Sequence, residues 1–434
     1  MDFGMYAPVL LIFWDFANTW WWLFLPFFVF GPFIFLWKEW RNEVFDNQNP
    51  YIMLEIRMPQ IVEKPIKAME QVFAGFWQFY DPPNDREFWF EGQYQKAFSI
   101  EIASIEGQVH FYLRTTDGSR KIMESALYAH YPEAEMLLVD DYVNLVPHNI
   151  PNKDWKVWGA EYRLDKPSPY PIKTYAQFFE ENPDTREEKR VDPVSMLVES
   201  LSKIGRGEHL WIQFILTPYA PQNKELKEFI DEGHGIVDKL VKRKVPPPKP
   251  ITLVQDASSV FYTLATGKEA VKQQGEEIQG MTYPELQMTP GERDIVKAIE
   301  TKISKQAFVS TMHFLYLART ENYFGPAKAL PMTYFNQYSS ANLNFFRPLY
   351  TVKVNTIANF FFDQRRNYLK RRRLLRAMLY RLPPFYPAGG GSFVLNIEEM
   401  ASLFHFSGKI TFPSATVPRV EAKKAEAPQE LPVE

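Results

Sequence analysis

Residues 98–139 constrain the fold of this chain more than any other stretch of its sequence. Apolar and polar residues alternate over residues 98–102 and again over residues 109–113, which is the two-residue period of half-buried strands. Glu106 and Gly107 separate the two runs, as a tight hairpin turn requires. The pattern therefore predicts two neighbouring antiparallel strands.

A helix and a further strand complete this unit. Residues 117–119 (Asp-Gly-Ser) interrupt the second strand and offer a helix N-cap. Apolar residues then recur at helical spacing as far as Pro132, and residues 136–139 resume the strand pattern. The unit contains no nucleophile, metal cluster or glycine loop. We expect an α+β scaffold in which a helix covers one face of a sheet.

An uncharged apolar run near the N-terminus predicts a membrane anchor. Residues 16–37 carry no charge, and at about 1.5 Å per residue they would span about 33 Å, enough for a hydrocarbon core of about 30 Å. Pro26 and Pro32 lie within the run, where a bilayer helix tolerates kinks. The first residues contain no Lys or Arg, unlike a cleaved signal peptide, whereas Lys38 and Arg41 follow the run directly. The positive-inside rule then places the remainder of the chain in the cytoplasm.

The composition excludes several classes of function. A length of 434 residues is enough for several domains. The formal net charge of -3 argues against nucleic-acid binding by the whole surface but permits a local basic patch. The absence of cysteine excludes disulfides, thiolate catalysis and cysteine zinc sites.

The order of helices and strands predicts a duplication. After the first α+β domain, residues 50–190, a helix begins at Asp192-Pro193 and the alternation of helices and strands returns. Residues 293–303 align with residues 120–130. The predicted fold class is α+β: an N-terminal transmembrane helix followed by a duplicated α+β sandwich-like domain. The ranges are 1–42 (membrane anchor), 50–190 (first domain), 191–350 (second domain, with an insert at 245–288), 355–412 (basic helix and C-terminal helix) and 413–434 (disordered tail).

No motif for catalysis is visible. The P-loop pattern G-x-x-x-x-G-K-[ST] does not occur, and the seven histidines show no metal-ligand spacing. Asp140 and Asp141 follow a strand and alternate between its faces, which makes them a poor acid–base pair. We therefore predict no enzymatic activity, no catalytic residue, no cofactor and no metal.

The helix expected over residues 360–381 is the most basic part of the chain. It permits three interpretations, which the sequence leaves open. Its charges could form a solvated face with Tyr368, Leu375 and Leu379 packed inward, bind anionic lipid, or bind the phosphates of a nucleic acid. The candidate ligand-binding residues are Arg365, Arg366, Lys370, Arg371, Arg372, Arg373 and Arg376.

Several motifs, taken in order, resemble a known family. They are PIKAMEQVFAGF, FSIEIASIEGQVHFYLRT, MESALYAHYPEAEMLLVDDY, DPVSMLVESLSKIGRGEHLWIQFILTP, TPGERDIVKAIETKISK, LKRRRLLRAMLYR and FVLNIEEMASLFHFSG. Their order resembles the N-terminal, membrane-anchored region of bacterial type IV secretion and conjugative DNA-transfer ATPases of the HerA–FtsK superfamily. The resemblance covers nearly the whole chain from Pro50 to about Lys423.

The resemblance implies a role in assembly. In that family a P-loop motor domain follows a linker like residues 413–434, where this sequence ends. We therefore expect a membrane-anchored, non-enzymatic scaffold of a type IV secretion or conjugation-like translocation system, with one span in the bacterial inner membrane and a cytoplasmic soluble part. It would position a partner P-loop ATPase at the cytoplasmic face, as a homo-oligomer. The alternative is a membrane-tethered module that binds DNA or another nucleic acid through residues 365–381.

Overall fold

The computed structural model describes most of the chain. The predicted insert, apart from Met288, and the predicted tail at residues 413–434 lie outside the described residues. The described segments are residues 7–59, 62, 64–178, 192–219, 224–241, 288–351, 363–382 and 391–406.

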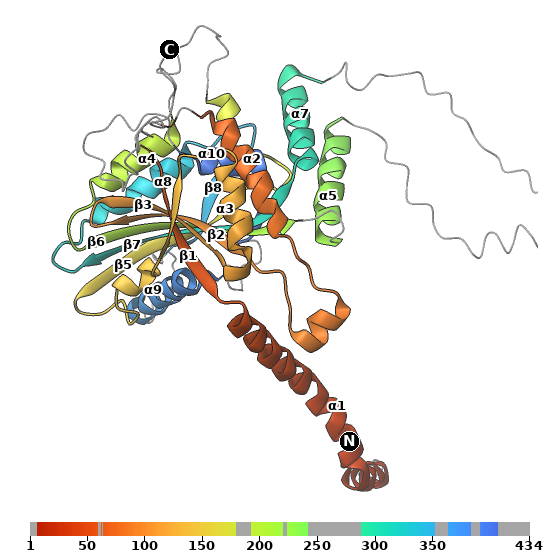
Figure 1. Ribbon diagram of the computed structural model, residues 1–434. Helices are drawn as coiled ribbons and strands as arrows, with labels where there is room; N and C mark the ends of the chain where they lie inside the picture. Colours follow the sequence, from red (N-terminus) through yellow and green to blue (C-terminus); the bar gives the residue numbers. More distant parts are fainter. Residues whose placement is uncertain are drawn as a thin grey trace, which may run out of the picture.

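A nine-stranded sheet forms the centre of the protein (Figure 1). Its strand order is β4-β1-β3-β2-β6-β7-β5-β8, β9 pairs with the first part of β7, and every pair is antiparallel. The strands are β1 (Tyr51–Arg57), β2 (Phe98–Ile105), β3 (Gln108–Thr116), β4 (Glu135–Val139), β5 (Trp155–Leu164), β6 (Glu208–Tyr219), β7 (Ala307–Arg319), β8 (Phe346–Thr351) and β9 (Phe393–Asn396).

Two units of the same topology make up this sheet. The first runs β1, α2 (Ile66–Phe76), β2, β3, α3 (Arg120–Tyr128), β4, and the second runs β5, α4 (Pro193–Ser202), β6, β7, α8 (Ala329–Asn336), β8. Each is a βαββαβ unit with the ferredoxin-like strand order. The units meet where β2 pairs with β6, so that equivalent strands lie at equal distances on either side of this central pair.

The repeat in the structure differs from the one expected from the sequence. The connection between β6 and β7 contains α5 (Lys224–Leu240) and α7 (Pro290–Ser304), which pack side by side. The first unit has only a tight turn at this point. Helix α7, which includes residues 293–303, therefore has no counterpart in the first unit, and α8 is the topological equivalent of α3. The expected sandwich is wrong, because strands from both predicted domains join one sheet.

The hairpin at residues 98–116 is confirmed. Strands β2 and β3 pair from Ser99 opposite Arg114 to Ile105 opposite Gln108. Gly107 in the turn has a φ of +87°, and a Cβ there would lie 2.6 Å from the carbonyl oxygen of Ile204. The turn therefore requires glycine both for its backbone conformation and for the space available.

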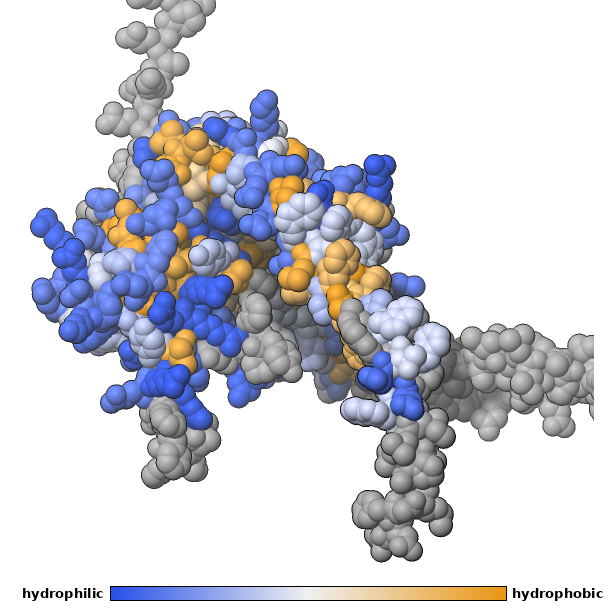
Figure 2. All heavy atoms as spheres, turned by 90° about the horizontal axis from the view of Figure 1, so that it is seen from below, coloured by the Kyte–Doolittle hydropathy of each residue, from blue (hydrophilic) through white to orange (hydrophobic). Residues whose placement is uncertain are grey.

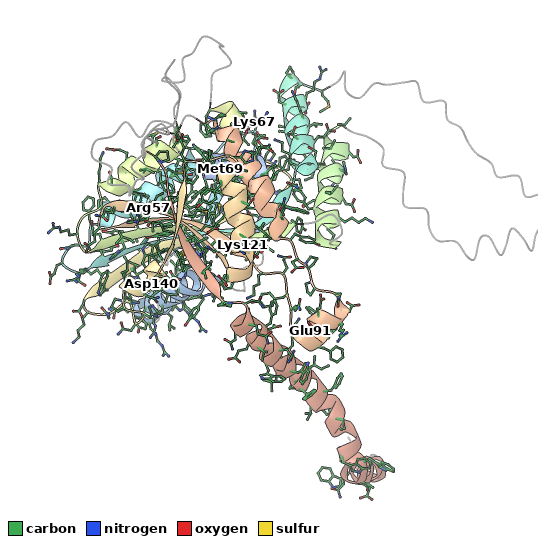
Figure 3. The ribbon with its side chains drawn as sticks, in the orientation of Figure 1. Arg57, Lys67, Met69, Glu91, Lys121 and Asp140 are labelled. Atoms are coloured by element: carbon green, nitrogen blue, oxygen red, sulfur yellow. The ribbon has the colours of Figure 1, made fainter. Side chains whose placement is uncertain are left out.

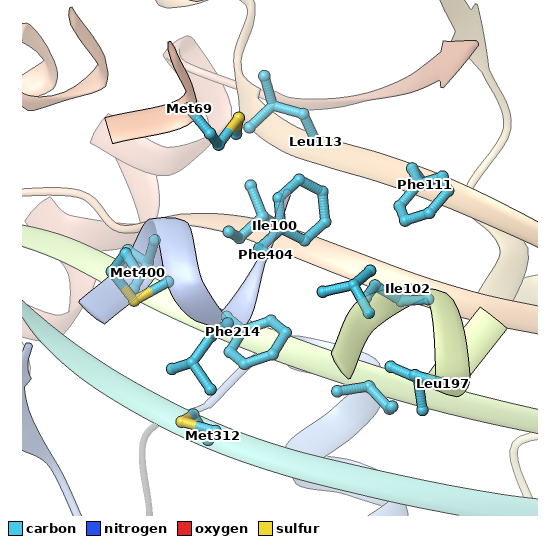
Figure 4. Packing of buried hydrophobic residues seen from close by; sticks show 14 of the residues in the cluster. Met69, Ile100, Ile102, Phe111, Leu113, Leu197, Phe214, Met312, Met400 and Phe404 are labelled. Atoms are coloured by element: carbon cyan, nitrogen blue, oxygen red, sulfur yellow. The ribbon is translucent and has the colours of Figure 1, made fainter. Parts of the chain in front are cut away.

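The largest hydrophobic core lies on one face of the sheet. Helices α2, α3, α4, α8 and α10 (Ile397–Leu403) cover this face (Figure 1). Figure 4 shows side chains from the helices packed over those of the strands. Met69 comes from α2, Leu197 from α4, and Met400 and Phe404 from α10 and its C-cap. The labelled residues of the sheet are Ile100, Ile102, Phe111, Leu113, Phe214 and Met312.

The prediction of a membrane span is wrong. Helix α1 (Ala7–Gln48) is long and projects from the sheet (Figure 1), but no helix among the described residues has both the length and the apolar character needed to cross a bilayer. The predicted run contains Asn18, Thr19 and three consecutive tryptophans, whose amphipathic rings favour interfaces over hydrocarbon. The single-pass inner-membrane localisation is therefore contradicted as well.

The C-terminal part of α1 packs against the protein. The Trp37 indole N–H donates to the carbonyl oxygen of Trp89 (3.1 Å), which belongs to the π-helical turn η3 (Glu87–Glu91). The Tyr94 hydroxyl donates to Asp46 (2.7 Å). These contacts join the end of α1 to the segment that precedes β2.

Candidate nucleic-acid interface

The predicted basic helix is α9 (Asp363–Tyr380), which lies on the opposite face of the sheet from α2, α3, α4, α8 and α10. Leu374, Leu375 and Met378 are buried against β5 and β7. These positions share one side of the helix, since residues three and four apart are neighbours on a helix surface. Of the three residues that the solvated-face interpretation packs inward, Leu375 is buried and Leu379 is partly buried against the same cluster. Tyr368, however, is 40% exposed and does not pack inward.

Gly159 of β5 allows α9 to approach the sheet. A Cβ at this position would lie 2.2 Å from the carbonyl oxygen of Phe314 and 2.8 Å from a methyl group of Leu374. The first distance is to backbone, which cannot move aside as a flexible side chain could. The absence of a side chain at residue 159 therefore fixes where α9 rests.

The basic side chains of α9 lie mainly on its outer side. The structure brings all seven predicted residues onto this helix: Arg365, Arg366, Arg372 and Arg376 are exposed, and Lys370, Arg371 and Arg373 are half-buried. Figure 2 shows hydrophilic residues gathered on the side of the molecule where α9 lies. We call these seven residues the α9 basic face.

Positive charge on the α9 basic face is only partly balanced by acidic groups. Within the described segments, Arg365, Arg372 and Arg376 form no ion pair with a carboxylate. Burial lowers the pKa of Lys370, and the neighbouring charge of Arg366 lowers it further. Such crowding of like charges favours the binding of an anion.

Arg381, directly after α9, anchors the helix to the sheet. Its guanidinium donates to Glu101 of β2 at 3.0 and 3.2 Å, and to Asp141 at 2.8 Å. Arg381 has a φ of +52°, which is costly for a residue with a side chain and persists only where surrounding contacts enforce it. Glu101 is fully buried and Arg381 nearly so. The end of α9 is therefore held at the middle of the sheet.

Glu101 belongs to a row of polar side chains that crosses the sheet beneath α9. It pairs in register with Gln213 of β6, which pairs with His313 of β7. The Gln213 amide donates to Glu101 (3.1 Å), and its oxygen lies 2.9 Å from Nε2 of His313. The Tyr142 hydroxyl also donates to Glu101. All four side chains are buried, so the row is closed to ligands and its role is structural.

The environment of this row shifts the pKa of its ionisable members. Burial alone would raise the pKa of Glu101, but the charge of Arg381 and the hydrogen bonds from Arg381, Ser99 and Tyr142 hold it below its ordinary value. Burial lowers the pKa of His313 to about 4. At neutral pH the row therefore contains a carboxylate paired with a guanidinium and a neutral imidazole.

The other residues considered from the sequence do not form a site. Asp140 is exposed, whereas Asp141 binds Arg381, so the two carboxylates do not act together. No group of His, Asp and Glu among the described residues could hold a metal ion. Sequence reasoning missed the pairing of Glu101 with Arg381, because nothing in the local pattern of either residue identifies its distant partner.

The fold and this surface define the class of the protein: an α+β module of two ferredoxin-like units with a basic helix fixed on the sheet. No protein-family model and no curated protein matches the chain.

Proposed function

We propose that the chain binds the phosphate backbone of a nucleic acid through the α9 basic face. The observation that carries this proposal is the fixed orientation of α9. Its apolar side is buried on the sheet, and the Arg381 pair holds its end. Arg365, Arg372 and Arg376 are exposed and form no ion pair with a carboxylate of the described segments. A rigid row of guanidinium groups suits phosphate, because each can donate two parallel hydrogen bonds to its oxygens.

Binding of this kind depends on salt. A protein that neutralises phosphates releases condensed counterions, so the logarithm of the association constant falls linearly with the logarithm of the salt concentration. Each phosphate contact adds about 0.7 to 0.9 to this slope. Solvated surface charges without a bound phosphate would give no such relation.

The test measures binding of a fluorescein-labelled oligonucleotide by fluorescence anisotropy at several salt concentrations. We expect Arg372→Gln/Arg376→Gln to weaken binding and to lower the salt slope by about 1.4 to 1.8, the contribution of two phosphate contacts. The matched control is Lys67→Gln/Lys121→Gln, which removes the same charge from α2 and α3 on the opposite face of the sheet (Figure 3). Equal losses in both double variants, or no binding by the unmodified protein, would refute the proposal.

An assembly role beside a P-loop ATPase is a second candidate, to which the family resemblance points. One structural feature favours it: a single sheet joins both units, so surfaces on either side of it keep fixed relative positions. The test is affinity purification of the tagged chain, followed by identification of a retained protein that carries a P-loop motif. If the chain neither associates with itself nor retains such an ATPase, this second function is wrong.

A further inference from the structure

Among the described residues, strand β4 forms one edge of the sheet and pairs only with β1. Its outer side therefore presents backbone groups that no strand among the described residues satisfies. The N–H of Met136 donates to the Tyr128 hydroxyl (3.2 Å), so it points away from β1. Because strand N–H groups alternate in direction, the N–H of Leu138 points outward as well. An edge of this kind can pair with an additional strand.

Apolar side chains accompany this edge. Leu138 of β4 is 59% exposed, and Ile122 and Tyr128 of α3 are 41% and 37% exposed. Leu138 pairs in register with the buried core residue Leu54, so both point to the face of the sheet that α3 covers. Leu138 and Tyr128 therefore flank the β4 edge, where alternate side chains of an added strand would lie. Ile122 precedes Tyr128 by six residues, which is about 120° around the helix, and so lies on the flank of α3 that faces α2, where Ala126 approaches Gly75.

Charge around this edge identifies the chemistry of the occupant. Glu133 and Glu135 lie before and at the start of β4, and Asp140 follows it; all three are exposed. In the described part of the chain none of them forms an ion pair. Lys121 is the opposing exposed charge on α3 (Figure 3). The edge is acidic on balance, which favours a basic partner.

We propose that the β4 edge binds an extended segment of a partner protein in which apolar residues alternate with Lys or Arg. The segment adds to the sheet as a further antiparallel or parallel strand. Its main chain bonds to the outward N–H of Leu138 and to the outward C=O groups of β4, its apolar side chains cover Leu138 and the ring of Tyr128, and its basic side chains approach the three acidic residues.

The probe is a fluorescein-labelled ten-residue peptide of alternating Lys and Val, titrated with the full chain and followed by anisotropy. Two further peptides separate the contributions. One replaces every Lys with Glu, and the other carries N-methyl groups on alternate backbone nitrogens and so cannot complete a strand ladder. We expect both to bind at least tenfold more weakly than the Lys–Val peptide. If the N-methylated peptide bound as tightly as the Lys–Val peptide, strand pairing would not contribute to binding, and the proposal would be wrong.

Variants of the protein provide the second arm. Leu138→Glu should weaken binding of the Lys–Val peptide at least fivefold. Ile122→Ser, on the flank of α3 that faces α2, and Met196→Ser on α4 remove similarly exposed apolar side chains and should not weaken it. Since Leu138 and Ile122 are exposed, unchanged thermal unfolding of the variants verifies that they fold. A loss that Met196→Ser reproduces, or absence of peptide binding, contradicts the proposal. The proposal is also contradicted if the chain forms a dimer in sedimentation and Leu138→Glu dissociates it, because a second copy of the chain would then occupy the β4 edge.

Discussion

The guanidinium of Arg381 lies within 3.2 Å of both carboxylate oxygens of Glu101, although the two residues are 280 positions apart in the chain. This buried pair connects the end of α9 to the strand at the centre of the sheet. Burying two charges is costly in itself, but here the second guanidinium edge binds Asp141, and Tyr142 and Gln213 also donate to Glu101. The pair therefore determines where α9 lies and how its basic face is oriented.

Removal of Arg381 should strongly destabilise the protein. Arg381→Met leaves the Glu101 carboxylate buried without its cation, which costs about 3–5 kcal/mol for such pairs. Chemical denaturation followed by circular dichroism measures the free energy of unfolding. Arg376→Met is the matched control, because Arg376 is exposed on the same helix, and its effect should stay within about 0.5 kcal/mol. Similar effects of the two substitutions would show that the Arg381 pair does not hold α9.

Stability should decrease as the pH falls from about 6.5 to about 4, in part because of His313. In the unfolded chain an imidazole has a pKa of about 6.5, whereas burial lowers the pKa of folded His313 to about 4, with Glu101 raising it and Arg381 lowering it. In this window the unfolded state binds a proton that the folded state excludes. The free energy of unfolding therefore falls by up to about 1.4 kcal/mol per pH unit for this residue.

Denaturation of His313→Gln over the same pH range tests this assignment. The variant should show a shallower pH dependence, although burial also lowers the pKa of His209 and that contribution will remain. His148→Gln, at an exposed position, should leave the dependence unchanged. An unaltered slope in His313→Gln would mean that other groups control stability in this range.

A second buried pair, Lys302 with Glu399, should contribute to stability in the same way. The Lys302 ammonium lies 3.0 Å from a Glu399 oxygen, and both side chains are fully buried between α7 and α10. Lys302→Met should destabilise the protein by about 3 kcal/mol in chemical denaturation, because it leaves the Glu399 carboxyl buried without a cation. Lys305→Met is the control: Lys305 binds Glu70 and Glu398 but is partly exposed, so its loss should cost about 1 kcal/mol or less. A larger loss of stability in Lys305→Met than in Lys302→Met would contradict this explanation.

Local elements of the fold were predictable because their signals are local. The alternation around Glu106 predicted the β2–β3 hairpin. Thr289 and Asn396 each stand three residues before a glutamate, which is the local pattern of a capping box, and the structure forms both boxes. The position of the basic residues on one helix also followed from the sequence.

The arrangement of the units could not be predicted in this way. β5 belongs to the predicted first domain, residues 50–190, yet it pairs with β7 and β8 of the predicted second domain. No local sequence pattern indicates such a pairing. Glu101 was a similar case. It alternates with apolar neighbours, which is the pattern of a polar residue that faces solvent. The sequence does not reveal that Arg381 and Tyr142 cover that face of the strand. Periodicity shows that a strand has two faces, but not what covers the second.

Substitution of Gly159 should weaken the contact between α9 and the sheet. In Gly159→Ala the new methyl group would meet the Phe314 carbonyl oxygen at 2.2 Å and Leu374 of α9 at 2.8 Å. Since the first atom belongs to a paired strand, α9 or β5 must shift, at a cost of about 1–3 kcal/mol. We expect faster amide hydrogen exchange in α9 than in α2, which lies on the other face. Gly118→Ala is the control, because a Cβ there meets no atom within 4 Å. If exchange in α9 were the same in both variants, the close approach at Gly159 would not determine how α9 is held.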